Sequence, residues 1–581
     1  MVAPSAETAR ERRRAAAAIS AFAFYVLLGF LRFHAVWVDP GRVTYGGQDA
    51  SVFIWFLGWT EHALASGTNP LFSHLLAAPT GVNLMWNTPV TLLGLVVAPI
   101  TSAAGPIVSY NLLLTISMPF SAFAAYLALR RFAPNWPSVV GGLLYGFGPV
   151  LIGMSQGHLH LEMAIFPPIL LMLLDDLVVR RRHPRRSAVL LGLASAGQLL
   201  VSSEVLVTGA LIAGIGLVLL ALLRPARVRL TAPAAARSIA LAACVAAPLA
   251  AFPLAVAFLG GQRPRGPLQP PGRAVSDLLT PVVPTPLQAI SPAALDRVSR
   301  HFTGGPVEVG GYLGVPLIML LAVIVWRRRR DLVVTWAAST AGIAALLSLG
   351  ARLHVNGRTT SIRLPWAALQ RLPNLDSVLP ARLALFVGLF AALILARGLS
   401  EFSTRRAPIG LLIAGIALAP LVPHPLGKPA AVAAPPYFSG PEVQQLPQNS
   451  LALAIPAPAP GQPQAMVWQA VANYRFRLIG CYCLVPGANG RASSFVPPGP
   501  FTAAIQQIVQ GQPEVSLDSA AVTADLQHLA PDVVLLGPAP HQDRLLARLT
   551  QLLGPPQQAT GLVTAWRLNH PILSRNSTIR R

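Results

Sequence analysis

Charge is scarce in this sequence. Only 11% of its 581 residues are charged, about half the fraction found in soluble domains. Acids are the rarer sign, with 21 Asp and Glu against 44 Lys and Arg, and Lys428 is the only lysine. The mean hydropathy is +0.56, and the apolar residues occur in blocks of about twenty, which is the length of a membrane span. These features exclude an ordinary soluble enzyme and indicate a polytopic membrane protein.

Cysteine is also scarce, with three residues in the chain. Cys244 lies in an apolar block, and we expect it to be a small core residue. Cys481 and Cys483 stand two apart, a spacing that fits poorly with disulfide geometry and supplies no metal-binding set. We therefore expect all three cysteines to have structural roles.

The basic residues explain the formal charge of +23 without a nucleic-acid partner. They cluster in short runs between apolar blocks, at 180–186, 224–229, 327–330 and 405–406. That distribution is typical of cytoplasmic loops under the positive-inside rule. No cleavable signal peptide is evident, because the basic residues 11–14 precede an apolar run longer than a signal sequence has. The N-terminus is therefore expected on the cytoplasmic side, with residues 1–15 as a disordered tail.

The apolar blocks predict an all-α polytopic domain over residues 16–424, with about 11–12 transmembrane helices. All the Arg clusters lie on the cytoplasmic side only if one block between 88 and 130 does not cross the membrane. Residues 88–104 form the shorter block and are interrupted by prolines, so we expect a re-entrant or interfacial helix there. This topology places two large loops outside, at 39–106 and 260–310. The blocks lie at 16–38, 88–104, 107–130, 136–154, 162–179, 186–202, 204–223, 236–259, 311–326, 332–350, 380–397 and 407–424.

The composition changes after the last block. Residues 425–450 are rich in proline and are expected to be a linker. Residues 451–581 have soluble patterning and are expected to form a small α/β domain outside the membrane. Strands are expected at 451–455, 474–480, 532–537 and 562–568, and helices at 500–511, 516–529 and 541–553.

Asp49 is the strongest candidate for a functional residue. It precedes a run dense in aromatic residues, 53–59, which is too short and too polar to span a bilayer but suits a helix lying along one. Aromatic rings favour the headgroup level, so the run would hold the Asp49 carboxylate at the membrane boundary. An ionisable group there is expensive unless it is paired or used. The alternative is that Asp49 simply caps the helix N-terminus.

Further polar residues face the same outer side in this topology. His158, His160 and Glu162 lie between two spans, where they could bind a metal, transfer protons or line a cavity. Lining a cavity is favoured, because a spacing of two brings the imidazoles to one face only in an extended segment. Glu204 begins the next outer hairpin and either joins this cavity or belongs to a solvated turn.

Two other groups have the chemistry of sugar and phosphate recognition. Asn83, Trp86 and Asn87 offer amides and an indole for hydrogen bonding and stacking; the alternative is a capped turn with an interfacial Trp. Arg263 and Arg265, in the loop 260–310, and Arg382, at the outer end of a span, suit a phosphate. Headgroup contacts or snorkelling are the alternatives for these arginines, and Asp376 is a possible ion-pair partner of Arg382.

Four stretches resemble a known family: NPLFSHLLAAPTGVNL at 69–84, GHLHLEMAIFPPILLMLLDDL at 157–177, GGYLGVPLIMLL at 310–321 and LPARLALFVGLFAALILARGL at 379–399. With the acid after the first span, they resemble bacterial polytopic glycosyltransferases of the GT-C fold, including the YfhO-like membrane proteins. The resemblance implies a seven-span module with a large outer loop after the seventh span. The expected loop at 260–310 holds that place.

Enzymes of this family transfer a sugar from a polyprenyl-phosphate carrier to an acceptor outside the cytoplasm. The resemblance thus implies a polyprenyl-phosphate sugar as donor, a cell-envelope glycan or glycolipid as acceptor, membrane lipids as surroundings and the plasma membrane as location. It makes Asp49 the candidate catalytic base. Many members have a paired DxD or ExD, whereas Ala50 and Ser51 follow Asp49 here. We therefore assign no metal site and no cofactor, and a divalent metal stays an open possibility.

Two other classes of function are compatible with the sequence. A transporter or lipid flippase would also need many spans and polar groups that face a cavity; the inverted repeat typical of that class is not evident. A non-catalytic envelope-assembly protein would use the outer C-terminal domain for binding.

Overall fold

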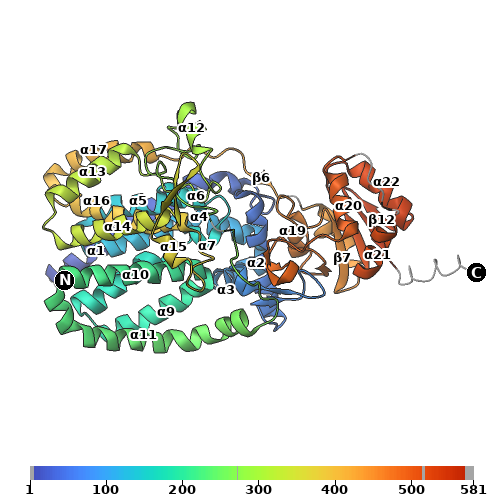
Figure 1. The fold of residues 1–581 in the computed structure, drawn as a ribbon, viewed down its shortest axis with the longest axis horizontal. Helices are drawn as coiled ribbons and strands as arrows, with labels where there is room; N and C mark the ends of the chain where they lie inside the picture. The colour runs from blue at the N-terminus through green and yellow to red at the C-terminus, as the bar shows by residue number, and fades with distance from the viewer. Residues whose placement is uncertain (1–5, 271, 433, 513–516, 518, 569–581) are drawn as a thin grey trace, which may run out of the picture. The chain divides into compact units, whose positions relative to one another are not determined.

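The computed structural model describes residues 6–270, 272–432, 434–512, 517 and 519–568. Most of the chain is helical, and the strands form small sheets (Figure 1). The chain divides into two compact units, each assembled from segments that are distant in sequence. Unit 1 comprises Met1–Val38, Leu112–Ala251 and Gln269–Lys428, and unit 2 comprises Asp39–Asn111, Phe252–Leu268 and Pro429–Arg581.

Unit 1 is built from helices and one antiparallel hairpin. The hairpin pairs β4 (Arg352–Val355) with β5 (Arg358–Arg363). The helices are α1 (Ala6–Phe33), the greater part of α4 (Pro106–Leu129), α5 (Asn135–Phe147), α6 (Pro149–Met154), α7 (Leu159–Glu162), α8 (Phe166–Leu174), α9 (Pro184–Val201), α10 (Ser203–Leu223), the greater part of α11 (Pro225–Leu259), α12 (Ala293–Ser299), α13 (Val315–Arg327), α14 (Leu332–Ser348), α15 (Trp366–Leu369), α16 (Ala384–Leu399) and α17 (Ala407–Leu418).

Helix α16 forms the centre of unit 1. Nearly all of its residues are buried, as expected for a helix that is apolar on every side. It packs against α5, α13 and α14. The approach of α5 is close, because a Cβ added to Gly141 would lie 3.0 Å from the carbonyl oxygen of Ala392. By contrast, α11 exposes most of its apolar residues. Cys244 on this helix is exposed, so its prediction as a core residue is wrong.

Within the described residues, seven helical segments are long and apolar enough to cross a membrane, where the sequence predicts eleven or twelve spans. They are Glu11–Val38, Pro106–Leu129, Asn135–Met154, Ser203–Leu223, Pro225–Leu259, Pro380–Leu399 and Thr404–Leu421. Several of the other expected spans are shorter or broken helices. The block expected at 162–179 consists of part of α7, helix α8 and a π-helix at Asp175–Arg180. Helix α3 (Thr91–Ala104), expected not to cross, has only 14 residues.

Unit 2 contains a five-stranded mixed sheet in the order β12-β13-β11-β7-β8. Strands β8, β7 and β11 are parallel, and β13 and β12 continue the sheet antiparallel. The sheet strands are β7 (Ser450–Ile455), β8 (Phe476–Leu478), β11 (Val533–Leu536), β12 (Gln558–Thr560) and β13 (Val563–Arg567). Four of the five lie where the sequence predicts a strand. Helices α20 (Pro500–Val509), α21 (Ala520–Leu529) and α22 (Gln542–Leu553) lie beside these strands (Figure 1). Their apolar side chains share one core with those of the strands.

The remaining elements of unit 2 come from all three of its segments. Strand β1 from the first segment pairs with β6 from the third. The segment expected as a linker is folded, and its Phe438 is fully buried against Trp468. The elements are α2 (Gly47–Ala65), α3, α18 (Pro441–Gln444), α19 (Gln464–Val471), β1 (Val43–Thr44), β2 (Phe72–Ser73), β3 (Val82–Asn83), β6 (Ala430–Ala431), β9 (Val485–Pro486) and β10 (Ala492–Ser493).

Helix α2 is a core helix of unit 2, which corrects the expectation of a helix exposed to the bilayer surface. Trp55 is fully buried and Trp59 is 4% exposed. The Trp55 indole donates a hydrogen bond to Gln469 of α19, and Tyr474 packs edge-on against both indoles. Dense aromatic residues suit a protein core as well as a headgroup layer, and the partners in the third segment decide between the two.

Candidate functional site

Asp49 lies in the first turn of α2. Gly46 and Gly47 precede it with φ of 106° and 59°, a conformation that glycine adopts without steric cost. The helix N-cap is Gly46, so the interpretation of Asp49 as the cap is wrong. Its carboxylate is half-buried and accepts a hydrogen bond of 2.8 Å from the hydroxyl of Tyr482. The carboxylate thus lies at the N-terminal end of α2, with Tyr482 as a fixed partner.

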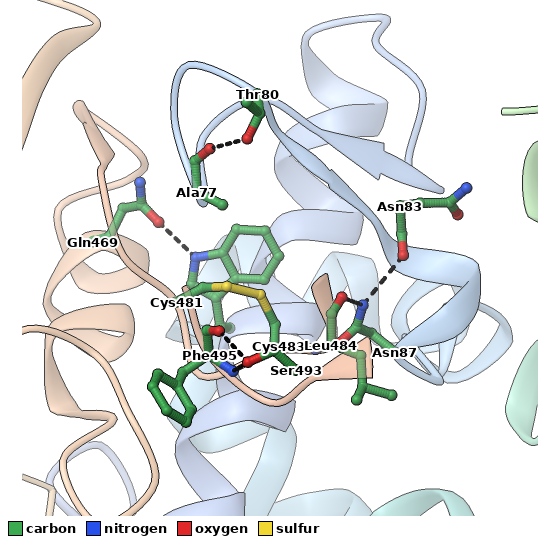
Figure 2. Close-up of a disulfide and its surroundings, with 11 residues drawn as sticks. Ala77, Thr80, Asn83, Asn87, Gln469, Cys481, Cys483, Leu484, Ser493 and Phe495 are labelled. Atoms are coloured by element: carbon green, nitrogen blue, oxygen red, sulfur yellow. Dashed lines mark hydrogen bonds between the residues drawn. A yellow bond between two sulfur atoms is a disulfide. The ribbon is translucent and has the colours of Figure 1, made fainter. Parts of the chain in front are cut away.

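Tyr482 is enclosed by a disulfide that the sequence interpretation missed. Cys481 and Cys483, on either side of it, are bonded to each other, and their Cα atoms are 5.4 Å apart (Figure 2). That separation lies inside the range that disulfides tolerate, so a spacing of two does not exclude the bond. The closed ring restricts the backbone at Tyr482 and thereby fixes where its hydroxyl meets Asp49.

The side-chain amides of Asn83 and Asn87 connect the turn around the disulfide with the second segment of unit 2. Asn87 donates to the carbonyl of Leu484 and accepts from the amide N–H of the same residue (Figure 2). Asn83 is 1% exposed and donates to the carbonyls of Val256, at 2.7 Å, and Gly261, at 3.0 Å. Both side chains therefore hold three distant stretches of backbone together.

Trp86 joins the same network through its ring. Its indole N–H donates to the carbonyl of Ala257 at 2.9 Å, and the ring meets Phe258 edge-on. The structure thus places the indole against the end of α11, within unit 2. The network around Asp49 runs through Tyr482, Leu484, Asn87 and Asn83 to the loop after α11, and we call it the disulfide-turn network.

Arg263 and Arg265 lie on that loop and are both exposed. The Arg263 guanidinium donates to the carbonyl of Phe258, and the Arg265 backbone N–H donates to Gly490 at 2.7 Å. Neither has a carboxylate partner among the ion pairs of the described residues. Their charge is therefore not neutralised within unit 2, which is what an anion-binding arginine requires.

A second polar group, in unit 1, surrounds Arg382. The guanidinium forms ion pairs with Glu204, at the start of α10, and with Glu308, at 3.0 Å. All three side chains are at most 18% exposed, and Glu204 also accepts from the backbone N–H of Leu379. The partners differ from Asp376, which the sequence interpretation considered. Because two carboxylates flank it, Arg382 here joins three parts of unit 1.

His158, His160 and Glu162 lie in the same unit, on and beside the single turn of α7. The two imidazole rings are 5.6 Å apart although the segment is helical rather than extended. Burial holds the pKa of His160 well below its usual range, and the charges of His158 and Arg382 lower it further. Glu162 is 1% exposed, and its Oε1 has no hydrogen-bond partner among the residues that the structure describes. Within the described residues, no group of three or more His, Cys, Asp or Glu is placed to hold a metal.

The sequence candidates therefore form two groups, one in each unit. Asp49, Asn83, Trp86, Asn87, Arg263 and Arg265 belong to unit 2, and His158, His160, Glu162, Glu204 and Arg382 belong to unit 1. Sequence reasoning missed Tyr482 and Glu308. The signal for Tyr482 was its position between two cysteines, and Glu308 was one of the few acids in the loop 260–310.

Several solved structures are similar to this chain over most of its length. Arabinofuranosyltransferase AftD from Mycobacteria shares 15% identity over 95% of this chain, with a TM-score of 0.49; this chain spans 39% of its length. ArnT from Cupriavidus metallidurans in the apo state shares 12% identity, covering 95% of this chain and 98% of ArnT, with a TM-score of 0.45. The apo oligosaccharyltransferase from Archaeoglobus fulgidus shares 12% identity over 89% of this chain and 69% of its own, with a TM-score of 0.46.

No protein-family model matches the chain, and no curated protein matches it. At 12–15% identity and TM-scores below 0.5, the similarities carry no argument about donor, acceptor or catalytic residues.

Proposed function

We propose that the protein is an integral membrane glycosyltransferase of the GT-C type. It moves a sugar from a polyprenyl-phosphate carrier to a cell-envelope glycan or glycolipid outside the cytoplasm. The exposed apolar side chains of α10, α11 and α17 support the membrane location, because extensive exposed apolar surface marks a face that contacts lipid or another protein. The disulfide in unit 2 supports its placement outside the cytoplasm, where disulfides persist.

The hydrogen bond between Asp49 and Tyr482 is the observation that carries the proposal. A catalytic base must be held in one orientation while it accepts a proton from the acceptor hydroxyl. Here the Cys481–Cys483 disulfide restrains Tyr482, and the N-terminus of α2 positions Asp49. In the proposed reaction the acceptor oxygen attacks the anomeric carbon, its proton passes to Asp49, and the bond to the carrier phosphate breaks.

The other residues have supporting roles in this proposal. Arg263 and Arg265 offset the charge that develops on the leaving phosphate. Asn83, Asn87 and Trp86 hold in place the loop that carries these arginines. If these three side chains contact the sugar, they do so while they hold that loop. His158, His160 and Glu162 line a polar part of unit 1, and Arg382 with Glu204 holds that part together.

The test is transfer by purified protein supplied with polyprenyl-phosphate sugars. Asp49→Asn keeps the shape of the side chain and its contact with Tyr482 but removes the basic oxygen, so transfer should fall by roughly 10²–10⁴-fold. Asp39→Asn, which removes an exposed acid of the same unit, is the matched control and should stay active. Full transfer by the Asp49→Asn protein would remove the proposed base.

A lipid-phosphate transporter is the second candidate, and the buried charges around Arg382 are the observation that favours it. Buried ionisable groups in a helical membrane protein often mark a transport path. Such a protein would move labelled polyprenyl phosphate across a liposome membrane without transferring sugar. The Asp49→Asn change would leave that movement unaltered, whereas the glycosyltransferase proposal predicts no movement that depends on Arg382.

A further inference from the structure

A polar cavity lies in unit 2, at the opposite end of α2 from Asp49. Its volume is about 410 Å³, within the range of roughly 300–1,000 Å³ typical of small-molecule sites. Its polar lining includes Glu61 and His62 from the last turns of α2, with Asn473 and Tyr474 after α19. Twelve residues of helix separate Asp49 from Glu61, which corresponds to about 18 Å along the helix axis. The cavity is therefore distinct from the candidate catalytic residue.

The wall of this cavity is rigid. Tyr474 is buried, its hydroxyl donates to the carbonyl of Trp55 at 2.8 Å, and its ring lies 4.7 Å from the His62 ring. Asn473 and Tyr474 have φ of 48° and 56°. Two consecutive non-glycine residues in the left-handed region are uncommon, and such residues often occur where side chains are aimed at a ligand.

Small residues keep the cavity open. Gly41, Gly58 and Gly105 contribute to its lining. A Cβ added to Gly58 would lie 2.5 Å from the Tyr474 hydroxyl, so any larger residue there would displace the tyrosine.

The polar groups of the lining match a ligand that both donates and accepts hydrogen bonds. Glu61 is half-buried and makes no hydrogen bond or ion pair to any described residue, and as a carboxylate it only accepts. His62 follows Glu61 on α2 and lines the same cavity. Burial lowers the pKa of His62, against the opposing effects of Asn473 and Glu61, so the imidazole is neutral and offers one donor and one acceptor.

Other ligand classes fit less well. The carboxylate repels anions, and no Arg or Lys is among the described residues of the lining. A single carboxylate beside a neutral imidazole is too weak a set for a divalent cation. Hydroxyl groups can form hydrogen bonds with all three polar side chains, those of Glu61, His62 and Asn473. The ring of Tyr474 offers the apolar surface on which a sugar face packs.

We infer that this cavity binds a neutral carbohydrate residue, separately from the site at Asp49. The inference needs no catalytic activity, so it holds or fails independently of the proposed transferase function.

The experiment measures sugar binding to the full-length protein in lipid nanodiscs, since maltoside detergents would themselves present a sugar. Methyl glycosides of glucose, galactose, mannose and arabinose serve as probes, with saturation-transfer NMR and calorimetry as readouts. At least one glycoside should bind. Glu61→Gln should weaken its binding by roughly tenfold or more, because a charged hydrogen-bond acceptor is lost. Ala65→Phe, which fills the cavity from an exposed position, should abolish binding.

Asp49→Asn is the matched control, and it should bind the glycoside as the wild type does. Thermal unfolding verifies that each variant is folded. The inference is overturned if no glycoside binds to the wild type, if Glu61→Gln binds with unchanged affinity, or if Asp49→Asn loses binding. Preferential binding of spermidine over every glycoside would also overturn it, since the cavity would then select amines.

Discussion

The two units of this protein stabilise their polar residues by different means. In unit 1, opposite charges hold Arg382 between Glu204 and Glu308, and all three are mostly buried. In unit 2, the disulfide-turn network uses neutral amides, backbone carbonyls and a covalent bond. Charges in low dielectric interact strongly but tolerate no missing partner. Amide-to-backbone contacts are individually weaker and fix geometry. Unit 1 should therefore be the more sensitive to loss of one side chain, and unit 2 the better suited to hold a base in place.

The largest effect expected from this comparison is on the stability of unit 1. Arg382→Met keeps the aliphatic bulk but leaves two buried carboxylates facing each other without a cation. The free energy of unfolding should fall by about 3–5 kcal/mol, measured by denaturant titration in detergent. Arg300→Met removes an exposed arginine of the same unit and should change it by less than about 0.5 kcal/mol. Equal small losses for both variants would show that the Arg382 ion pairs are screened.

A smaller effect is expected from removing the disulfide of unit 2. The double variant Cys481→Ser, Cys483→Ser should lose about 1–2 kcal/mol of stability, because the loop that the bond closes is very short. Transfer should decline several-fold, since Tyr482 is then held less firmly against Asp49. Transfer by the Tyr482→Phe variant should decline by a similar factor, because its one hydrogen bond to Asp49 is lost.

The two changes should not be additive if the disulfide acts through Tyr482. Removing both cysteines in a Tyr482→Phe background should leave the rate of transfer unchanged. A further loss of the same size in that background would mean that the disulfide acts elsewhere.

The smallest effect concerns the pH dependence of unit 2. The pKa of His62 is lower in the folded protein than its ordinary value of 6.5, chiefly because of burial. The unfolded chain therefore binds a proton more readily, and stability should be lost as the pH falls below about 6.5. His62→Gln should reduce this slope, whereas His528→Gln, at an exposed position in the same unit, should retain it. Unfolding midpoints between pH 5 and pH 8 provide the measurement. An identical slope in both variants would contradict the prediction.

Local patterns in the sequence were sufficient to place many elements of unit 2. The strands at Ser450–Ile455, Val533–Leu536 and Val563–Arg567 lie where short apolar runs predict them, and nearly all of their residues are buried. The run after Asp49 was also identified as a helix. Its environment was not, since burial of Trp55 depends on Gln469 and Tyr474, more than 400 residues away in sequence.

The candidate site was predictable as a set of residue types but not as a set of contacts. Asn83 and Asn87 were chosen for chemistry that suits a sugar, yet their amides bind the backbone of Val256, Gly261 and Leu484. No local rule indicates such partners. The disulfide was dismissed on spacing alone, whereas the Cα separation of 5.4 Å shows that the local backbone accommodates it.

The edge of the five-stranded sheet has a consequence for biosynthesis. Strand β8 is completed by the first segment of unit 2, where the N–H of Leu478 donates to Leu75 and the N–H of Ala78 donates to Leu478. During translation the first segment emerges long before residues 429–581. The indoles of α2 and the backbone groups of Leu75 and Ala78 therefore stay without their partners until the third segment is made. A chain that stops before Pro429 should present them to chaperones and proteases, and one that lacks residues 39–111 should leave an unpaired strand open to aggregation.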